Sequence, residues 1–583
     1  MASLSKIFTA ATFSLAALAS AETLRFEAED AIPADDHNAE VVSDENASGG
    51  SYVAMKEGNL LFTVTVPADG YYTLWANYQL PTKSGSKVQN LTINGSSAGQ
   101  ISFGTSDSFT TIKGAGKIKL STGTNTIGIV KSWGWINLDY IELTEYEETP
   151  FSINNAPVDP NATESAQKLY SFLYQNFGNH VISGVMTNGV FLNDGKYTTC
   201  DYTNQTELAY IKEVSGKNVA LVGFDFLHAT GMSSEGDWHK GYTHAALEMA
   251  KNVWNAGGIP AFNWHWKDPS DSVEAFYTES SGNTPYTIFH ITRAYDTTSG
   301  TWFTDSDDYK AIVADIETIA DSLQTLQDAD VAILWRPLHE ASGKWFWWGT
   351  DGAKACVALY KLMFDIFTNQ KGIHNLIWVW TTDEAGDALD WYPGDEYVDV
   401  VGRDYYYYPR EANHASLVSS FETVKDIYGA KKIIALSENG SVPMPDSMKA
   451  DGANWSWFMP WYGDYAMPSW ANDNTDESWN EVMNSEYTIT LEDMPGWENY
   501  VAGIQKAPAM LLNASLLLQG NLLYVNGEGL SHVTIFDLNG NRVLNQKVST
   551  TSGVLNLEML SRGSYMVQIR SGNNQQSLPI MLR

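Results

Sequence analysis

The sequence predicts a multidomain protein with an N-terminal β-sandwich of jelly-roll type, a central (β/α)8 barrel and a small C-terminal all-β domain. Three patterns support this organisation. Residues 22–146 contain alternating apolar and polar runs between turn residues, residues 162–505 alternate short apolar runs with helical segments, and residues 506–583 return to strand patterns. At 583 residues the chain is also too long for a single packed core.

Residues 1–21 have the pattern of a secretory signal peptide. Lys6 precedes an apolar run over 7–18, and the small residues 19–21 then fit a cleavage site after Ala21. The apolar run is too short to span a bilayer, and no later segment has the length and apolarity of a membrane helix. We therefore expect an exported protein, secreted or at the cell surface, with no transmembrane segment.

Composition narrows the classes of partner. The net charge of −34 would repel a phosphate backbone, so we expect no nucleic-acid partner. The 21 Trp and 30 Tyr exceed what cores usually need, and surplus aromatics suit surfaces that stack on sugar rings, although large cores are the alternative explanation. Cys200 and Cys356 are the only cysteines, which excludes a disulfide framework but leaves open whether these two pair.

The β-sandwich is predicted from strand-like runs at 60–80, 88–95 and 125–130, which Gly, Asn, Asp and Ser turns separate. Residues 147–161 are polar and proline-containing, so we expect a linker there. In the C-terminal domain, 506–583, an Asn-Gly dipeptide within 533–548 predicts a β-hairpin. This domain has no cluster of ionisable groups that suggests chemistry, and we expect it to be non-catalytic.

The barrel is predicted from eight apolar runs, the number that a (β/α)8 fold requires. They are 180–186, 218–225, 258–266, 331–337, 375–380, 398–404, 432–440 and 455–461. One intervening helix is clear over 308–327, where Ile312, Ile316 and Leu323 fall on one face. A doubly wound sheet would also alternate, but these runs end in polar or aromatic residues, as strand ends at a shared active site should.

The ends of these runs carry the candidate chemistry. In chain order they bring Trp264 and His265, then Arg336, His339 and Glu340, then Asp404 and Tyr406, then Glu438, and finally Trp461. Two glutamates across one barrel mouth are what glycoside hydrolysis needs, because one donates a proton and the other attacks or activates water. Whether they have the short separation of a retaining enzyme or the longer one of an inverting enzyme is not fixed by the sequence.

Neighbouring residues suggest which glutamate is the acid and which is the ionised carboxylate. Glu340 precedes a tryptophan-rich loop, and partial burial there would keep its proton to higher pH, as an acid requires. Glu438 could be held ionised by a hydrogen bond from Tyr406. His265 and His339 could instead indicate a metal site, but the spacing supplies no third zinc ligand, and no GxSxG motif supports a serine hydrolase. The cluster 345–349 is either packing or a sugar platform, which we expect of at least Trp345.

Four segments together resemble glycoside hydrolase family 26, whose best-known members are endo-β-1,4-mannanases: WRPLHEASGKWFWWG (335–349), NLIWVW (375–380), YPGDEYVDVVGRDYY (392–406) and ALSENG (435–440). The resemblance implies a retaining mechanism that needs no cofactor, with Glu340 as acid/base and Glu438 as nucleophile. It also implies substrate-binding or orienting roles for His265, Arg336, His339, Trp345, Tyr406 and Trp461, with Arg336 and His339 orienting the acid and neighbouring substrate hydroxyls. Lys344 departs from the pattern, where an acidic or small polar residue is expected, which puts substrate contacts in doubt.

The terminal domains carry resemblances of their own. FEAED (26–30) and WGWINLDYIEL (133–143) resemble a carbohydrate-binding module of family 35, or of the neighbouring family 6. This implies a structural Ca²⁺ held by Glu27, Glu29 and Asp139, and sugar contacts from Trp133, Trp135 and Asn137. The alternatives are a solvated acidic strand end for the carboxylates and packing in the core for some of the other three residues. The C-terminal segments VTIFDLNGNRV and GSYMVQI are similar to sorting domains of exported bacterial enzymes, which implies secretion or surface attachment.

Taken together, these features lead us to expect a secreted, monomeric, endo-acting β-1,4-mannanase that acts on plant cell-wall mannan. Family 26 also contains enzymes for mixed-linkage β-1,3-1,4-glucan and β-1,3-xylan, so these substrates stay open. A third alternative is a non-catalytic polysaccharide-binding protein. The pair of glutamates argues against it, because a lectin gains nothing from two carboxyl groups that face each other.

Overall fold

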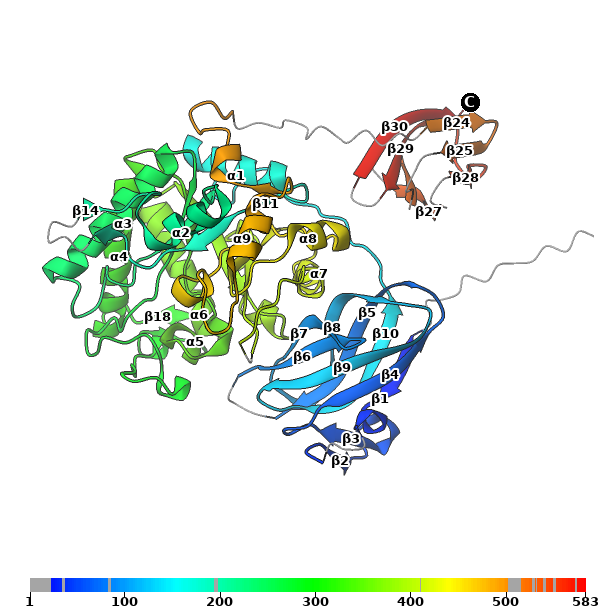
Figure 1. Cartoon of the computed structure of the whole chain (residues 1–583), viewed down its shortest axis with the longest axis horizontal. Coiled ribbons are helices and arrows are strands. Elements are labelled where there is room, and N and C mark those ends of the chain that lie inside the picture. Colours follow the sequence, from blue (N-terminus) through cyan, green and yellow to red (C-terminus); the bar gives the residue numbers. More distant parts are fainter. Residues whose placement is uncertain are drawn as a thin grey trace, which may run out of the picture. The chain divides into compact units, whose positions relative to one another are not determined.

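The computed structural model describes residues 23–33, 37–81, 85–192, 198–408, 410–501, 515–526, 530, 532–537, 542–548, 552–571 and 574–582. The expected signal peptide, 1–21, lies outside these residues. The chain divides into two units, Met1–Thr149 and Pro150–Arg583 (Figure 1).

The first unit is a β-sandwich, as the sequence predicts. One sheet has the strand order β2-β3-β10-β5-β8, with β1 paired to β10, and the other has the order β4-β9-β6-β7. Along β4, buried and exposed residues alternate strictly, so one face of the strand packs in the core and the other meets water. The strands are β1 (Leu24–Glu27), β2 (Glu40–Ser43), β3 (Ser51–Ala54), β4 (Leu60–Val66), β5 (Gly70–Leu80), β6 (Lys87–Ile93), β7 (Ser96–Phe103), β8 (Ser106–Leu120), β9 (Gly123–Trp133) and β10 (Asn137–Glu145).

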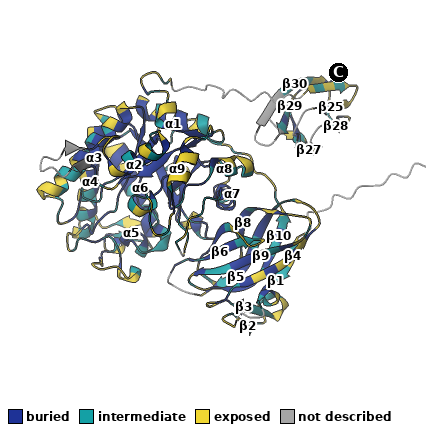
Figure 2. Cartoon of the chain, in the orientation of Figure 1, coloured by how far each residue is buried: buried dark blue, intermediate teal, exposed yellow. Residues whose placement is uncertain are grey.

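The second unit contains a parallel barrel whose seven named strands pair in chain order. They are β12 (Gly184–Met186), β15 (Leu221–Asp225), β16 (Ile259–Asn263), β19 (Ile333–Arg336), β20 (Leu376–Thr382), β21 (Val400–Tyr405) and β22 (Ile433–Asn439). Every residue of β20 is buried, as expected for a strand with a packed barrel interior on one side and helices on the other. Figure 2 shows buried residues in dark blue inside this unit and exposed residues in yellow on its outer helices.

The segment 455–461 occupies the eighth barrel position. Ser456 N donates to Ile434 O of β22 at 2.8 Å, and on the other side Ile182 N donates to Ser456 O at 2.9 Å. Near the end of the segment, Met186 N donates to Pro460 O at 2.9 Å. All eight predicted runs therefore stand in the predicted order, and the (β/α)8 barrel is confirmed.

Helices and short elements complete this unit. The α-helices are α1 (Glu164–Asn176), α2 (Thr206–Ser215), α3 (Asp237–Asn255), α4 (Asp307–Gln327), α5 (Trp347–Thr350), α6 (Ala353–Phe364), α7 (Val418–Ile427), α8 (Pro445–Asp451) and α9 (Asp476–Met483). The short strands pair as β11 (Val181–Ile182) with β23 (Thr488–Ile489), β13 (Phe191–Leu192) with β14 (Thr198–Thr199), and β17 (Tyr295–Asp296) with β18 (Thr301–Trp302). The short 3-10 or π segments across both units are η1 (Ala28–Ala31), η2 (Ser48–Gly50), η3 (Glu279–Ser281), η4 (Ile291–Arg293), η5 (Ala341–Gly343), η6 (Asp365–Lys371), η7 (Ala388–Asp390), η8 (Gly463–Tyr465) and η9 (Leu491–Asp493).

Helix α4 shows how the sequence sets a boundary. Ser306 is its N-cap, and the side chain accepts a hydrogen bond from Tyr309 N at 3.1 Å. Ile312, Ile316 and Leu323 are fully buried on one face, as the spacing predicts. The helix begins one residue before the predicted range because the cap precedes the apolar pattern.

The C-terminal residues form two antiparallel sheets around a small core of their own. The strands are β24 (Ser515–Gln519), β25 (Leu522–Asn526), β26 (His532–Phe536), β27 (Arg542–Lys547), β28 (Ser552–Asn556), β29 (Gly563–Ser571) and β30 (Asn574–Leu582). Strands β26 and β27 pair as the predicted hairpin. Within the described residues, none of the helices has the length and apolar character that a membrane crossing requires.

The two cysteines do not pair. Both Cys200 and Cys356 are buried free thiols. The question that the sequence left open is therefore answered, and packing rather than a disulfide holds the barrel together.

Candidate active site

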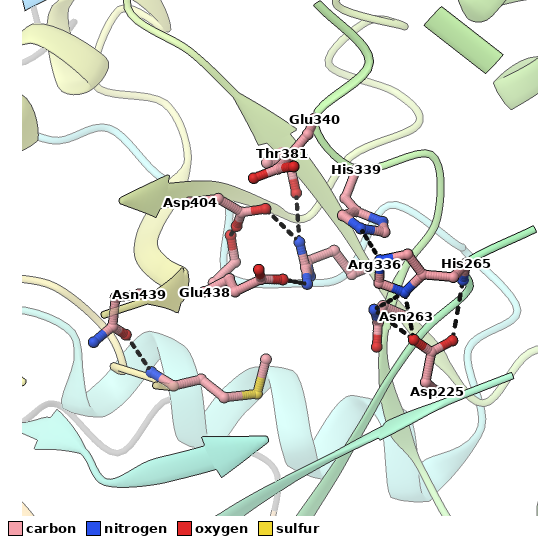
Figure 3. Close-up of polar contacts among 12 residues, drawn as sticks. Asp225, Asn263, His265, Arg336, His339, Glu340, Thr381, Asp404, Glu438 and Asn439 are labelled. Carbon is pink, nitrogen blue, oxygen red and sulfur yellow. Dashed lines mark hydrogen bonds and ion pairs between the residues drawn. The ribbon is translucent and has the colours of Figure 1, made fainter. Parts of the chain in front are cut away.

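Three carboxylates converge at the ends of the barrel strands (Figure 3). Glu438 lies on β22, Asp404 on β21, and Glu340 four residues beyond the end of β19. One oxygen of each carboxylate lies within 4.8 Å of an oxygen of the other two. Retaining glycosidases hold their two carboxyl groups about 5–5.5 Å apart, and inverting enzymes hold them about 6.5–9.5 Å apart. The geometry therefore fits the retaining reaction.

Glu438 is held at both oxygens. Arg336 Nη2 donates to its Oε2 at 2.5 Å, and the hydroxyl of Tyr406 donates to its Oε1 at 2.7 Å. The guanidinium also pairs through Nη1 with Asp404 Oδ2 at 2.6 Å. Burial by itself would lower the pKa of Arg336, but the charges of Asp404 and Glu438 raise that pKa above its ordinary value. A permanent cation thus lies beside a fixed Glu438 carboxylate, as a nucleophile requires.

Arg336 donates hydrogen bonds to the nucleophile rather than to the acid, on which it acts through its charge. We expected it to orient the acid, Glu340, and neighbouring substrate hydroxyls, whereas its hydrogen bonds go to Asp404, Glu438 and Thr381. The reason is its position as the last residue of β19, because side chains there project into the barrel toward β21 and β22. Arg336 therefore belongs with the nucleophile.

Glu340 has the environment of an acid. Burial raises its pKa well above the ordinary value, and the charges of Asp404 and Glu438 raise it further. The indole of Trp345 donates to Glu340 Oε2 at 3.1 Å, which fixes the side chain. The backbone of Glu340 is left-handed, with φ of 54°, a conformation that non-glycine residues adopt at a cost and that is frequent at functional sites.

Asp404 had no predicted role, although it was expected at the end of the sixth barrel strand. It is buried, accepts a hydrogen bond from Ser437 Oγ at 2.7 Å, and is bound by Arg336. Burial raises its pKa to about 6, against the opposing effect of Arg336. Its charge contributes to the raised pKa of Glu340, so it helps to separate the protonation states of the two glutamates.

The two histidines form one hydrogen-bonded chain with Asp225. His265 Nε2 lies 3.3 Å from His339 Nε2, and His265 Nδ1 lies 2.5 Å from Asp225 Oδ2. Burial, with Arg336 and His265 nearby, lowers the pKa of His339 well below its ordinary value, so this ring is neutral. Asp225 was missed in the sequence, although it is the last residue of the second apolar run and so had the same signal as the other site residues.

The histidines do not join the carboxylates in a metal-like cluster. Across the part of the chain that the structure describes, Glu340, Asp404 and Glu438 are the one group of three potential ligands that converges within 4.8 Å. Arg336 already pairs with two of these carboxylates, and a guanidinium there opposes a second cation.

The aromatic cluster 345–349 serves both packing and the cleft. Trp347 and Trp348 are fully buried, and their indoles donate to Trp266 O and His339 O. Trp345 is only partly buried and reaches Glu340, so this side chain alone keeps the expected cleft position. Across the site, the ring of Trp461 meets that of His265 edge-on at 5.7 Å between centroids.

In the N-terminal sandwich, the structure brings Glu27, Glu29 and Asp139 together around η2. Ser48 binds two of them, through its N–H to Asp139 at 2.9 Å and through its hydroxyl to Glu27 at 2.8 Å. Ser51 Oγ donates to Glu29 at 3.0 Å. The second oxygens of Glu27 and Glu29 are buried with no hydrogen-bond partner. Burial raises the pKa of Asp139 to about 6, and the two glutamate charges add to this effect.

The expected sugar contacts of the sandwich separate into two groups. Trp133 and Trp135 are 41% and 42% exposed, and Lys87 Nζ lies 4.2 Å from the ring centroid of Trp133. Asn137 is instead buried, and its amide donates to Gln79 at 3.3 Å. Asn137 begins β10 and lies opposite Gln79 in the sheet, so its position fits the alternative that it is a core residue.

Comparison with known proteins covers all three regions. The model of glycosyl hydrolase family 26 matches residues 158–493, that of carbohydrate binding module family 35 matches residues 24–146, and that of the secretion system C-terminal sorting domain matches residues 519–582. The mannan endo-1,4-beta-mannosidase of Thermothelomyces thermophilus is 32% identical over 496 residues, which cover 83% of this chain and 93% of the relative.

Solved structures agree with these matches. A beta-mannanase from a symbiotic protist of the termite Reticulitermes speratus, complexed with gluco-manno-oligosaccharide, is 43% identical and has a TM-score of 0.54, with 60% of this chain and 100% of that chain covered. The GH26-CBM35 beta-(1,4)-mannanase of Podospora anserina is 32% identical with a TM-score of 0.51, and the match covers 82% of this chain and 99% of that chain.

Proposed function

Because this chain belongs to glycoside hydrolase family 26, we infer that it is an endo-acting, retaining β-1,4-mannanase that hydrolyses the backbones of mannan, galactomannan and glucomannan. The observation that supports the retaining mechanism is the convergence of Glu340 and Glu438, because one carboxylate oxygen of each lies within 4.8 Å of the other. Their different surroundings give each glutamate a separate task.

In the first step, Glu340 donates its proton to the glycosidic oxygen while Glu438 attacks the anomeric carbon. The bond between that carbon and the leaving oxygen breaks, and a covalent glycosyl ester forms on Glu438. The raised pKa of Glu340 keeps the proton available for this step. Arg336 and Tyr406 hold the Glu438 carboxylate in line for attack.

In the second step, Glu340 is the base. It removes a proton from water, the water oxygen attacks the anomeric carbon, and the ester bond to Glu438 breaks. Glu340 thereby regains its proton, and the sugar leaves with its original configuration. Within the same proposal, neutral His339 and the Asp225-bound His265 orient sugar hydroxyls, and Trp345 and Trp461 contact the sugars at the cleavage point.

The matches of the terminal domains support an exported enzyme that binds a polysaccharide. The C-terminal sorting domain indicates that the protein is secreted or held at the cell surface. In our proposal, residues 1–21 act as the signal peptide that starts export, and the protein works as a monomer. The family 35 module binds the polysaccharide, with Trp133 and Trp135 as its sugar contacts.

We also propose a structural Ca²⁺ in the N-terminal module, bound by Glu27, Glu29 and Asp139. The support is chemical, since the charges of Glu27 and Glu29 act on Asp139, one buried oxygen of each glutamate has no hydrogen-bond partner, and hard carboxylate oxygens suit Ca²⁺. The bound cation would offset the two glutamate charges, which add to the effect of burial on the pKa of Asp139. Catalysis needs no cofactor in this proposal.

If this proposal is right, removing Ca²⁺ destabilises the sandwich alone. A ligand present at about 100 times its Kd stabilises a domain by about 2.7 kcal/mol, which for a domain of this size is an increase in Tm of about 10 °C. Calorimetry of the full chain with EDTA or with Ca²⁺ measures this shift. In the Glu27→Gln, Glu29→Gln double variant we expect no Ca²⁺ effect, and a wild-type protein whose transitions ignore Ca²⁺ would contradict the site.

The substrate is tested by measuring reducing-sugar release from galactomannan, glucomannan, mixed-linkage β-glucan and β-1,3-xylan side by side. We expect release mainly from the two mannans, with an early fall in viscosity because the enzyme cuts within chains. Release only from β-glucan or β-1,3-xylan would keep the mechanism and overturn the substrate. Binding with no release from any polymer would overturn the enzyme assignment.

A further inference from the structure

One exposed aromatic residue of the barrel unit has no role in the reaction described above. Trp470 is 75% exposed, the largest value for any large apolar side chain among the described residues from 150 to 501. It lies in the loop between η8 and α9, after the eighth barrel position. A single exposed apolar side chain needs no explanation by itself, so the question is whether the structure holds this indole in place.

Arg410 holds it. The guanidinium carbon of Arg410 lies 5.3 Å from the ring centroid of Trp470 and 3.8 Å from that of Tyr465. Its Nε donates to the buried Asp473 at 2.7 Å, and its Nη2 donates to Asp464 O at 2.6 Å. A cation fixed by a buried carboxylate and stacked on a second ring is a rigid support. The indole is thus presented to solvent at a defined place.

The residues that hold Trp470 in place also contact the residues around the nucleophile, Glu438. The ring of Tyr465 meets the ring of Tyr406 edge-on at 5.0 Å, and Tyr406 donates to Glu438. Asn474 ties the same loop to the end of β22, because its amide donates to Tyr465 O at 2.7 Å and to Gly440 O at 2.9 Å. The loop that carries the exposed indole is therefore anchored to the strand end that carries the nucleophile.

We propose that Trp470 is a sugar-stacking platform that binds a backbone sugar remote from the cleaved bond, on the Glu438 side of the cleft, and that Arg410 is its positioning residue. The face of a β-1,4-linked pyranose that carries axial C–H groups is apolar and packs flat on an indole. A polymer that crosses the barrel mouth extends beyond the reacting sugars, so a long chain reaches the platform and a short one does not. This rests on the proposed function and specifies it as a preference for long chains.

The test compares substrates of two lengths. In Trp470→Ala we expect kcat/KM for mannohexaose to fall about fivefold, through KM, because a stacking contact is worth about 1 kcal/mol. For the shortest manno-oligosaccharide that the wild type cleaves, we expect a change of less than twofold. Trp470→Phe keeps a ring and should retain most of the activity on mannohexaose. Arg410→Lys loses the planar guanidinium that lies against both rings. Its kcat/KM for mannohexaose should lie between those of Trp470→Ala and Trp470→Phe.

The control is Tyr174→Ala, since Tyr174 is an exposed aromatic, 38% accessible, on the outward helix α1. It should leave both substrates unaffected. Unchanged mannohexaose kinetics in Trp470→Ala would overturn the platform, and so would an equal loss on both substrates, which would indicate damage to the site itself. A wild type that cleaves no manno-oligosaccharide would overturn the proposed function first, and the platform for mannan with it.

Discussion

Replacing Glu438 with alanine should lower kcat on mannan by about 10⁵-fold, because the covalent intermediate loses the atom on which it forms. Polymer binding should stay close to that of the wild type. Glu438 contributes two hydrogen bonds that Arg336 and Tyr406 donate, and both partners remain in place to meet the sugar. Steady-state kinetics and calorimetric titration with mannohexaose measure the two effects.

Rescue of the Glu438→Ala variant by azide tests whether Glu438 is the nucleophile. A small anion that enters the cavity of the Glu438→Ala variant attacks the anomeric carbon from the same side as the lost carboxylate. With an activated aryl β-mannobioside, azide should therefore restore turnover and give the α-glycosyl azide, with the configuration inverted. The exposed Glu481→Ala on α9 is the matched control and should behave as the wild type. Full activity of Glu438→Ala on mannan would sink the assignment of the nucleophile.

The sequence predicted well those features that depend on local pattern. Apolar runs identified all eight barrel positions, because strands buried on both faces need continuous apolar residues. The residues that end those runs, such as His265, Glu340 and Glu438, lie together because parallel strands bring their carboxyl ends to one rim. No knowledge of packing was needed for either inference.

The pairing of side chains across the barrel could not be predicted in the same way. Arg336 was assigned to its sequence neighbour Glu340, yet it binds Glu438, which is distant in sequence and close across the barrel mouth. Asp225 supports His265 from the neighbouring strand, and its pairing depends on the register of β15 against β16. Such contacts depend on strand tilt and register, which residue spacing does not encode.

Asn137 shows a different limit of prediction from sequence. Sugar contacts were expected from its segment WGWIN, with the alternative that some of Trp133, Trp135 and Asn137 are core residues. In the structure both tryptophans are exposed, whereas Asn137 begins β10 and its buried amide donates to the cross-strand neighbour Gln79. A motif can therefore locate a segment in the sequence without separating its exposed side chains from its buried ones.

Replacing Glu340 with alanine should be costly only when the leaving group needs a proton. On mannan we expect kcat/KM to fall about 10³-fold, since general acid catalysis contributes about 10²–10⁴-fold. An aryl β-mannobioside whose phenol is strongly acidic leaves without help, so its first step should stay fast and the glycosyl ester on Glu438 should accumulate. Azide then attacks the ester and should give the β-glycosyl azide, with retained configuration. An α-azide from this variant would reverse the roles of the two glutamates.

The pH profile provides the second readout for Glu340. The first step needs this carboxyl protonated, so activity is lost as pH rises through its pKa, and a raised pKa moves that loss to higher pH. Burial and the charges of Asp404 and Glu438 raise it well above the ordinary value of about 4.3. The wild type should therefore keep its activity on mannan well above that pH, and the Glu340→Ala variant should lose this alkaline limb. If the limb stays unchanged in the variant, it reports another group, and the proton donor must be sought elsewhere at the barrel mouth.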